Sequence, residues 1–193
     1  PGWHIECSVM SSRYLGERFD IHGGGTDLIF PHHENERAQS EAFFGVKPWV
    51  SVWMHVGLVM VGADKMSKSL GNIIPLRDAL KKWKPEVLRL WYLHVHYRKP
   101  LYFSEESIES TKRLCERINS AYRLVERLHR EAKELHYLKN ADLSILKQLI
   151  DLNSKFHRAL SSDFNTPEAL AVISELTSLI YREIQYNPKY MLI

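Results

Sequence analysis

Short apolar runs alternate with glycine-rich turns over residues 1 to about 100, which is the pattern of an α/β domain. The run Phe19–His22 predicts a short strand that ends at the triplet Gly23–Gly25. Pro31 fits the first turn of a helix that continues through Glu36. The Val- and Met-rich segment Trp53–Met60 predicts a buried strand.

Helical patterns take over further along the chain. Two helices are predicted at Asp78–Trp83 and Pro85–Tyr97, with Pro85 at the first helical position. Three more follow, and their predicted N-caps are Ser104, Asp142, and Asn165 or Thr166. The long helix after Ser104 carries one apolar face, made of Ile108, Thr111, Cys115, Ile118, Tyr122, Val125, Ala132 and Leu135. The pattern therefore predicts an α/β part, residues 1–100, followed by an all-α helix bundle, residues 101–193.

Composition limits the classes of protein to which this chain can belong. Of its 193 residues, 45% are hydrophobic and 11% aromatic, which is enough for a packed core. The formal net charge of +3 permits nucleic-acid contact through a local patch but does not require it. Cys7 and Cys115 form no disulfide framework, which favours a reducing cytoplasm. No apolar run approaches the roughly 18 residues that span a membrane, so no membrane partner is expected.

A lysine-rich segment is the strongest chemical signal. Lys65 and Lys68 lie three residues apart in Lys65–Ser69, among small hydroxyl residues, and a Gly-Asn turn follows. Such a cationic loop suits a polyphosphate, because lysine charges can stabilise the negative charge that develops on a leaving group. An arbitrary Lys-Ser segment is more often a solvated surface loop.

Cys7, His32 and Glu36 are candidate metal ligands. His32 and Glu36 are four residues apart on a predicted helix, so both side chains leave the same face. A thiolate, an imidazole and a carboxylate together suit Zn²⁺. The alternatives are a cysteine that acts as a small buried hydrophobe and a His-Glu pair on a solvated helix face.

The glycine triplet and its neighbours suggest a ligand site. Glycine lets the backbone approach a ligand closely, and Asp27 could bind ribose hydroxyls. His22, at the end of the predicted strand, could touch a substrate or be a satisfied structural histidine. Trp3, taken by itself, is expected to be a core aromatic residue.

Several segments together resemble the cysteinyl-tRNA synthetases, which are class I aminoacyl-tRNA synthetases. The matching segments are PGWHIECS at residues 1–8, FDIHGGG at 19–25, FPHHENE at 30–36, KMSKSLGN at 65–72 and DFNTP at 163–167. The resemblance implies the C-terminal part of a Rossmann-like class I catalytic domain, followed by a helical domain. It also implies ATP-dependent activation of cysteine to cysteinyl-adenylate and transfer to tRNA(Cys).

In that family two cysteines, a histidine and a glutamate hold zinc, and Cys7, His32 and Glu36 match three of these four. The fourth ligand, a cysteine, belongs to the family's N-terminal half, and Cys115 on the apolar helix face is not expected to replace it. A soft metal that binds a thiolate but hardly a hydroxyl separates cysteine from serine better than an apolar pocket can.

The resemblance also assigns roles around the nucleotide. It implies that Lys65 and Lys68 are catalytic, and that ATP with Mg²⁺ is bound with the help of Gly25, Thr26, Asp27, Val59 and Lys68. Trp3 and His22 would line the amino-acid pocket. A basic face on the long helix would follow the tRNA, and it comprises Lys112, Arg113, Arg117, Arg123, Arg127 and Arg130. An ordinary amphipathic helix, its charge diluted by Glu116 and Glu126, is the alternative.

The ends of the chain indicate a piece of a longer protein. It begins at Pro1 without methionine and ends at Ile193 without a clear stop, and the His-x-Gly-His signature of class I enzymes is absent. The missing N-terminal half is therefore an expected partner, and the isolated piece is expected to be inactive. Two alternatives remain: a cysteine ligase of mycothiol synthesis, against which Glu36 argues, and a non-catalytic RNA-binding derivative.

Overall fold

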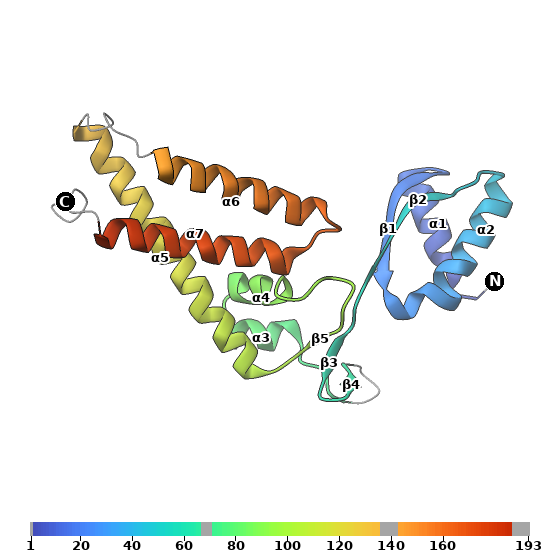
Figure 1. Ribbon diagram of the computed structural model, residues 1–193. Coiled ribbons are helices and arrows are strands. Elements are labelled where there is room, and N and C mark those ends of the chain that lie inside the picture. The colour runs from blue at the N-terminus through green and yellow to red at the C-terminus, as the bar shows by residue number, and fades with distance from the viewer. Residues whose placement is uncertain (1, 67–70, 136–142, 187–193) are drawn as a thin grey trace. The chain divides into compact units, whose positions relative to one another are not determined.

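The chain folds into two compact units. The structure, a computed structural model, describes residues 2–66, 71–135 and 143–186 (Figure 1). The first unit combines Pro1–Met66 with Tyr97–Tyr102, and the second combines Ser67–His96 with Phe103–Ile193. The predicted domains, 1–100 and 101–193, stay a prediction, because compact units in space need not follow domain boundaries in sequence.

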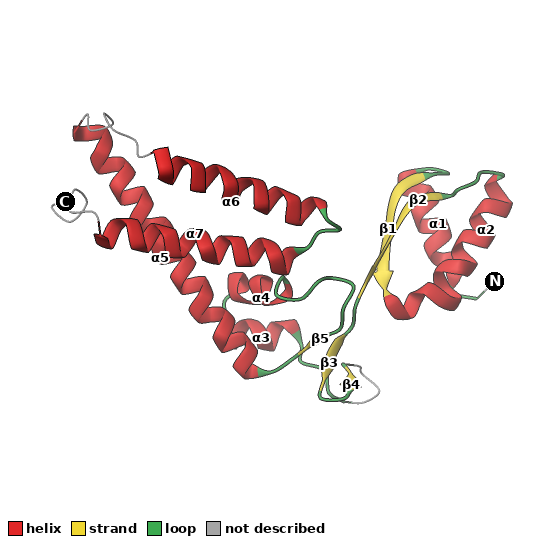
Figure 2. Cartoon of the chain, in the orientation of Figure 1, coloured by secondary structure: helices red, strands yellow, loops and turns green. Residues whose placement is uncertain are grey.

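The first unit contains a short parallel sheet with a helical crossover (Figure 2). Its elements are α1 (His4–Leu15), β1 (Phe19–Gly25), η1 (Thr26–Leu28), η2 (Ile29–His33), α2 (Glu34–Phe44), β2 (Val50–Val56), β3 (Val59–Val61), β4 (Asp64–Lys65) and β5 (Leu101–Tyr102). Strand β1 pairs with β2 in parallel, with Phe19 opposite Val50 and Gly25 opposite Val56. Parallel neighbours need a crossover, and η1, η2 and α2 supply it. Strand β3 pairs antiparallel with β4 and parallel with β5.

The strand predicted at Trp53–Met60 is corrected by the structure. Strand β2 starts earlier, at Val50, and its pairing ends at Val56, so β3 is a separate element. The break arises where a distant segment returns: Gly57 donates its N–H to the Tyr97 carbonyl oxygen at 2.7 Å. The predicted segment is not uniformly buried either, because Val56 is 41% exposed.

The N-terminal helices differ from the sequence pattern in two ways. Helix α1 was not predicted, although it packs beside α2 (Figure 2). The helix expected from Pro31 begins as the π-helix η2, whose only non-helical residue is Phe30 (φ −134°, ψ 134°), and it becomes the regular α-helix α2 at Glu34. The core of the first unit includes Trp49, which is 0% exposed. The Trp49 and Phe19 rings meet edge-on, with their centroids 5.2 Å apart.

In its described residues the second unit contains helices and no strand. Its elements are α3 (Leu76–Lys82), α4 (Pro85–Tyr92), α5 (Glu105–Leu135), α6 (Leu143–Ser161) and α7 (Thr166–Tyr186). Pro85 takes the predicted first position of α4, but this helix ends at Tyr92 and not at Tyr97. Two predicted N-caps are confirmed: Ser104 Oγ accepts the Ser107 N–H at 3.1 Å, and Asn165 Oδ1 accepts the Glu168 N–H at 3.4 Å. The predicted cap Asp142 lies outside the described residues.

Helix α5 buries a different face from the predicted one along its second half. Ile108 and Thr111 are 0% and 2% exposed, as the apolar pattern indicates. Further along, Ala121 is buried while Tyr122 is 62% and Val125 43% exposed. The buried face therefore shifts by one position, because α7 packs against this helix and the small alanine side chain takes little room. The side chains of residues 131–135 lie outside the description.

Helices α6 and α7 complete the predicted bundle. Leu152, Val172 and Leu179 form a buried apolar cluster between them, and Phe156 and Leu176 pack against it. Helix α4 is joined to α5 by the Trp91 indole N–H, which donates to Ser107 Oγ at 2.9 Å. No helix in the described part of the chain has both the length and the apolarity that a bilayer crossing requires.

Gly57 permits the close return of the chain and gives a first prediction. A Cβ at this position would overlap the Lys99 carbonyl group, which is backbone and cannot rotate away. Gly57→Ala should lower the free energy of unfolding by about 1–3 kcal/mol, as overpacking does. Urea denaturation measures the effect. Gly23→Ala is the matched control, because its Cβ would lie 3.4 Å from the nearest atom, and equal losses in both variants would contradict the prediction.

Candidate functional site

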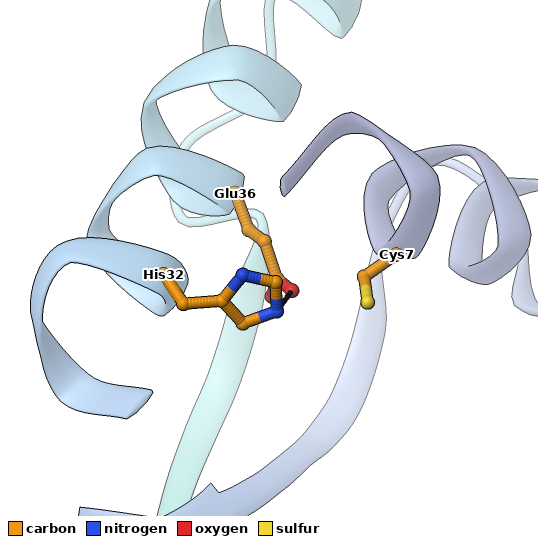
Figure 3. Close-up of side chains that lie close together, drawn as sticks. All are labelled: Cys7, His32 and Glu36. Carbon is orange, nitrogen blue, oxygen red and sulfur yellow. Dashed lines mark ion pairs between the residues drawn. The ribbon is translucent and has the colours of Figure 1, made fainter. Parts of the chain in front are cut away.

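The structure brings the three predicted metal ligands together. Cys7 comes from α1, His32 from η2 and Glu36 from α2, and their side chains converge (Figure 3). One ligand atom of each lies within 4.8 Å of the others. Glu36 is completely buried, His32 is 7% exposed and Cys7 is half-buried. The trio is therefore a buried cluster and not a solvated helix face.

The Glu36 carboxylate is held between two histidines. Its Oε1 lies 2.6 Å from His32 Nε2, and its Oε2 lies 2.8 Å from His22 Nε2. Burial by itself would raise the pKa of Glu36, but the hydrogen bond and charge of His22, the charge of His32 and the bond from Cys7 outweigh it. The pKa of Glu36 is consequently lowered, so the carboxylate is ionised and able to bind a cation.

The Cys7 thiol carries its proton in this arrangement. Burial raises the pKa of Cys7, and the hydrogen bond to Glu36 and the negative charge of Glu36 raise it further. A protonated thiol is a weak ligand, so a metal that bound here would have to displace the proton. The site thus favours a cation that competes well for sulfur.

Three histidines that the sequence analysis did not single out surround this cluster. His4 Nδ1 lies 2.8 Å from His32 Nδ1, and His33 Nδ1 lies 2.8 Å from His55 Nε2. In each pair one nitrogen must carry the hydrogen, which couples the tautomers of the two rings. His4 could have been found from its position three residues before Cys7 on a helix, whereas nothing in the sequence around His55 marks it.

Burial keeps the outer histidine pair neutral. Desolvation is the largest effect on His33 and lowers its pKa, and together with the charges of His22, His55 and His32 it outweighs the raising effect of Glu36. Burial also lowers the pKa of His55, with help from His22 and Arg98. Neutral imidazoles offer a lone pair, which is the form that metals bind.

Trp3 lies at the edge of the cluster and is not a core residue. Its side chain is 62% exposed, and its ring stacks on His32 at a centroid distance of 6.2 Å and an interplanar angle of 16°. The expectation from the isolated residue, a core aromatic, is therefore wrong. The role of Trp3 and His22 as walls of an amino-acid pocket stays a prediction.

The predicted nucleotide residues lie in one part of the first unit. Gly25 ends β1, Thr26 and Asp27 form η1, and Val59 begins β3. Asp27 Oδ2 lies 3.8 Å from Lys65 Nζ, which connects the glycine turn to β4. Lys68 lies outside the described residues. The binding roles of all these residues stay predictions.

The basic residues of α5 are exposed as predicted. All six, Lys112, Arg113, Arg117, Arg123, Arg127 and Arg130, are solvent-exposed. One of them also supports the bundle, because Arg117 donates to Ser178 Oγ on α7 at 2.8 Å. The face is therefore a charged surface, and its use in RNA binding stays a prediction.

Comparison with known families identifies the chain. Residues 1–113 match the model of the class I (C) tRNA synthetase catalytic domain, and residues 155–191 match the DALR domain. The chain belongs to this class I tRNA synthetase family. The catalytic-domain match corresponds to the expected α/β fold, and the DALR match lies within the expected helical part.

Curated relatives in this synthetase family are named cysteine–tRNA ligases. The protein from Staphylothermus marinus is 67% identical over the whole chain, and the one from Saccharolobus solfataricus is 51% identical over 99% of it. The chain spans about 40% of the length of these relatives. A solved LeuRS–tRNA–LeuAMS ternary complex from Agrobacterium radiobacter K84 matches 85% of this chain and 23% of its own, with a TM-score of 0.69 and 20% identity. At that identity the likeness concerns the fold.

The buried carboxylate gives a prediction about stability. Glu36→Ala should lower the free energy of unfolding by about 3–5 kcal/mol in metal-free protein, because His22 and His32 lose their buried partner. Glu34→Ala, on the same helix, is the control. Its ion pair with Arg37 is about half exposed, so the loss should be within roughly 1 kcal/mol. Chemical denaturation with a chelator present measures both, and similar losses would contradict the assigned role.

Proposed function

We propose that this chain is the part of a cysteine–tRNA ligase that recognises the cysteine thiol and supplies the lysines for its activation by ATP. The Cys7–His32–Glu36 cluster carries the proposal, because its thiol, imidazole and carboxylate donors lie within 4.8 Å of one another. The names of the curated relatives support the same activity. Cysteine, ATP with Mg²⁺ and tRNA(Cys) are the substrates of the proposed reaction.

The donor set fits zinc. A soft thiolate beside an imidazole and a carboxylate is a combination that zinc sites use. When bound, zinc would supply an affinity for the thiolate of cysteine that the hydroxyl of serine lacks. Glu36 is ionised and buried, His32 is held by His4, and Cys7 has to give up its proton. The fourth ligand belongs to the rest of the full-length protein.

The residues next to the cluster would hold the amino acid. Trp3 is exposed and stacks on His32, so its indole face is available to an incoming side chain. His22 reaches the same carboxylate from the middle of β1 and would restrict the space on the other side. These two rings would orient the substrate and exclude water from it.

Activation itself requires charge and not a general base. The carboxylate of cysteine is already ionised at neutral pH and can attack the α-phosphate of ATP. Negative charge then grows on the departing pyrophosphate, where Lys65 and Lys68 would stabilise it. Asp27, whose Oδ2 lies 3.8 Å from Lys65 Nζ, would accept hydrogen bonds from the ribose and connect the ribose end to the phosphate end.

The remaining parts of the reaction lie with the helical unit and with the rest of the protein. The exposed basic face of α5 would contact tRNA phosphates. Strands β1 and β2 expose apolar side chains, Ile21 at 63% and Val52 at 54%, which the N-terminal half of the full-length protein would cover. Two unpaired cysteines suit a cytoplasmic enzyme.

ATP–pyrophosphate exchange and tRNA-charging assays on the full-length protein test this proposal, and two other functions are among their outcomes. Cysteine-dependent exchange between ATP and pyrophosphate, followed by charging of tRNA, is the expected result. Exchange followed by transfer to an amino-sugar would identify a mycothiol-pathway ligase. Absence of exchange together with RNA binding would identify a non-catalytic derivative and contradict the proposal.

Cys7→Ser should reduce both zinc content and amino-acid selectivity of the full-length protein. Loss of the thiolate weakens the metal, so preference for cysteine over serine should fall toward the ~10²-fold that an apolar pocket gives. Cys115→Ser is the matched control, because Cys115 lies on α5 in the other unit. Elemental analysis and activation kinetics for both amino acids measure the effect. An unchanged zinc content in Cys7→Ser would remove this residue from the site.

Lys68→Ala should lower the kcat of cysteine activation by about 10²–10³-fold and change the cysteine KM little. The reason is that a lysine on the leaving group acts more strongly in the transition state than in the ground state. Lys147→Ala, an exposed lysine on α6, is the control. An increase of KM for cysteine with kcat unchanged would show that Lys68 has another role.

A further inference from the structure

A second group of metal-binding side chains lies beside the first. His22, His33 and Glu36 each offer a ligand atom within 4.8 Å of the other two. The two groups share only Glu36, because Cys7 and His32 complete the first and the histidines His22 and His33 the second. Two imidazoles and one carboxylate form a donor set that Fe²⁺, Co²⁺ and Zn²⁺ accept.

The two oxygens of Glu36 face different ways. Oε1 lies 2.6 Å from His32 in the first group, and Oε2 lies 2.8 Å from His22 in the second. A single carboxylate can therefore serve one cation with each oxygen. Ligands about 2.1 Å from a tetrahedral zinc ion lie roughly 3.4 Å apart, so the His22–Glu36 contact would need to open by only about half an ångström.

His33 is oriented for binding by another ring. Its Nδ1 lies 2.8 Å from Nε2 of His55, which stands on the neighbouring strand β2. When the His33 Nδ1–H donates to His55, the lone pair of His33 is left on Nε2. Metal-binding histidines almost always use the second ring nitrogen in this way, as a donor to a fixed partner.

The surrounding chain is shaped to this histidine pair. A Cβ on Gly24 would lie only 2.6 Å from His33 Cε1, so the glycine leaves the space that the ring occupies. Trp53 packs against both rings, with centroid distances of 4.9 Å to His22 and 5.2 Å to His33. His33 is 5% exposed, so the rings are held by packing and not by chance contact at a surface.

We propose that His22, His33 and Glu36 form a second site for a divalent transition-metal ion, beside the Cys7 site and bridged to it by Glu36. The inference rests on the proposed metal centre only through this shared carboxylate. Because one carboxylate would serve two cations that repel each other, the second ion should bind more weakly than the first. Occupation would take His22 away from the substrate pocket, so excess metal should inhibit the enzyme.

Cobalt titration of the metal-free full-length protein tests this proposal. Co²⁺ bound to a thiolate gives a sulfur charge-transfer band, which reports the Cys7 site, and equilibrium dialysis gives the number of ions per chain. Wild-type protein should bind two ions, the tighter one with the charge-transfer band. His33→Phe, which keeps a ring for packing, should bind one ion and keep the band. His55→Ala should weaken the second ion by about 10–100-fold and leave the first unchanged.

The results separate this site from the proposed function. Cys7→Ser should weaken the ion that gives the band and lower the band's intensity, because one of the two expected thiolates is removed, and it should still bind an ion in a manner that depends on His33. A wild-type protein that saturates at one ion with the band overturns the second site and leaves the first intact. Two ions without any thiolate band would overturn the Cys7 site instead. His22→Leu removes a different ligand and must reproduce the loss seen in His33→Phe, while circular dichroism confirms folding, and two ions in both variants would overturn the proposal.

Discussion

The buried carboxylate of Glu36 is the interaction on which the candidate site depends. It is completely buried and joins α2 to η2 through His32 and to β1 through His22. Its bond to the Cys7 thiol adds α1 to the same point. A buried charge without partners would cost several kcal/mol, so these partners must come together for the unit to fold. The stability of this part of the molecule and its capacity for a cation therefore have the same origin.

The chemistry of the donor set explains why a thiol would be recognised here. Glu36 is ionised while Cys7 retains its proton, so Glu36 supplies one negative charge and Cys7 can supply a second when a soft cation displaces that proton. His33 beside it is buried, and this burial lowers its pKa, so that it supplies a neutral nitrogen atom. Such surroundings favour a transition metal over calcium or magnesium, which prefer oxygen ligands.

The sheet positions the nucleotide residues through close backbone packing. Gly57 allows the segment that follows Tyr97 to return against the end of β2, and Leu101 then pairs beside Val59. This return gives β3 a partner on each side and supports β4, which carries Lys65 toward Asp27. Gly57 thus makes room for the strand that pairs with β3 on the side opposite β4.

Local spacing allowed the sequence to determine several features by itself. The separation of four residues between His32 and Glu36, the cap at Asn165 and the helix start at Pro85 depend on interactions within one or two turns. The family motifs likewise lie in continuous segments. Only the tertiary structure decided that His22 also binds Glu36, that His33 pairs with His55, and that Ala121 is buried in place of Tyr122. Those outcomes depend on packing between elements far apart in sequence, which the periodicity of one segment does not contain.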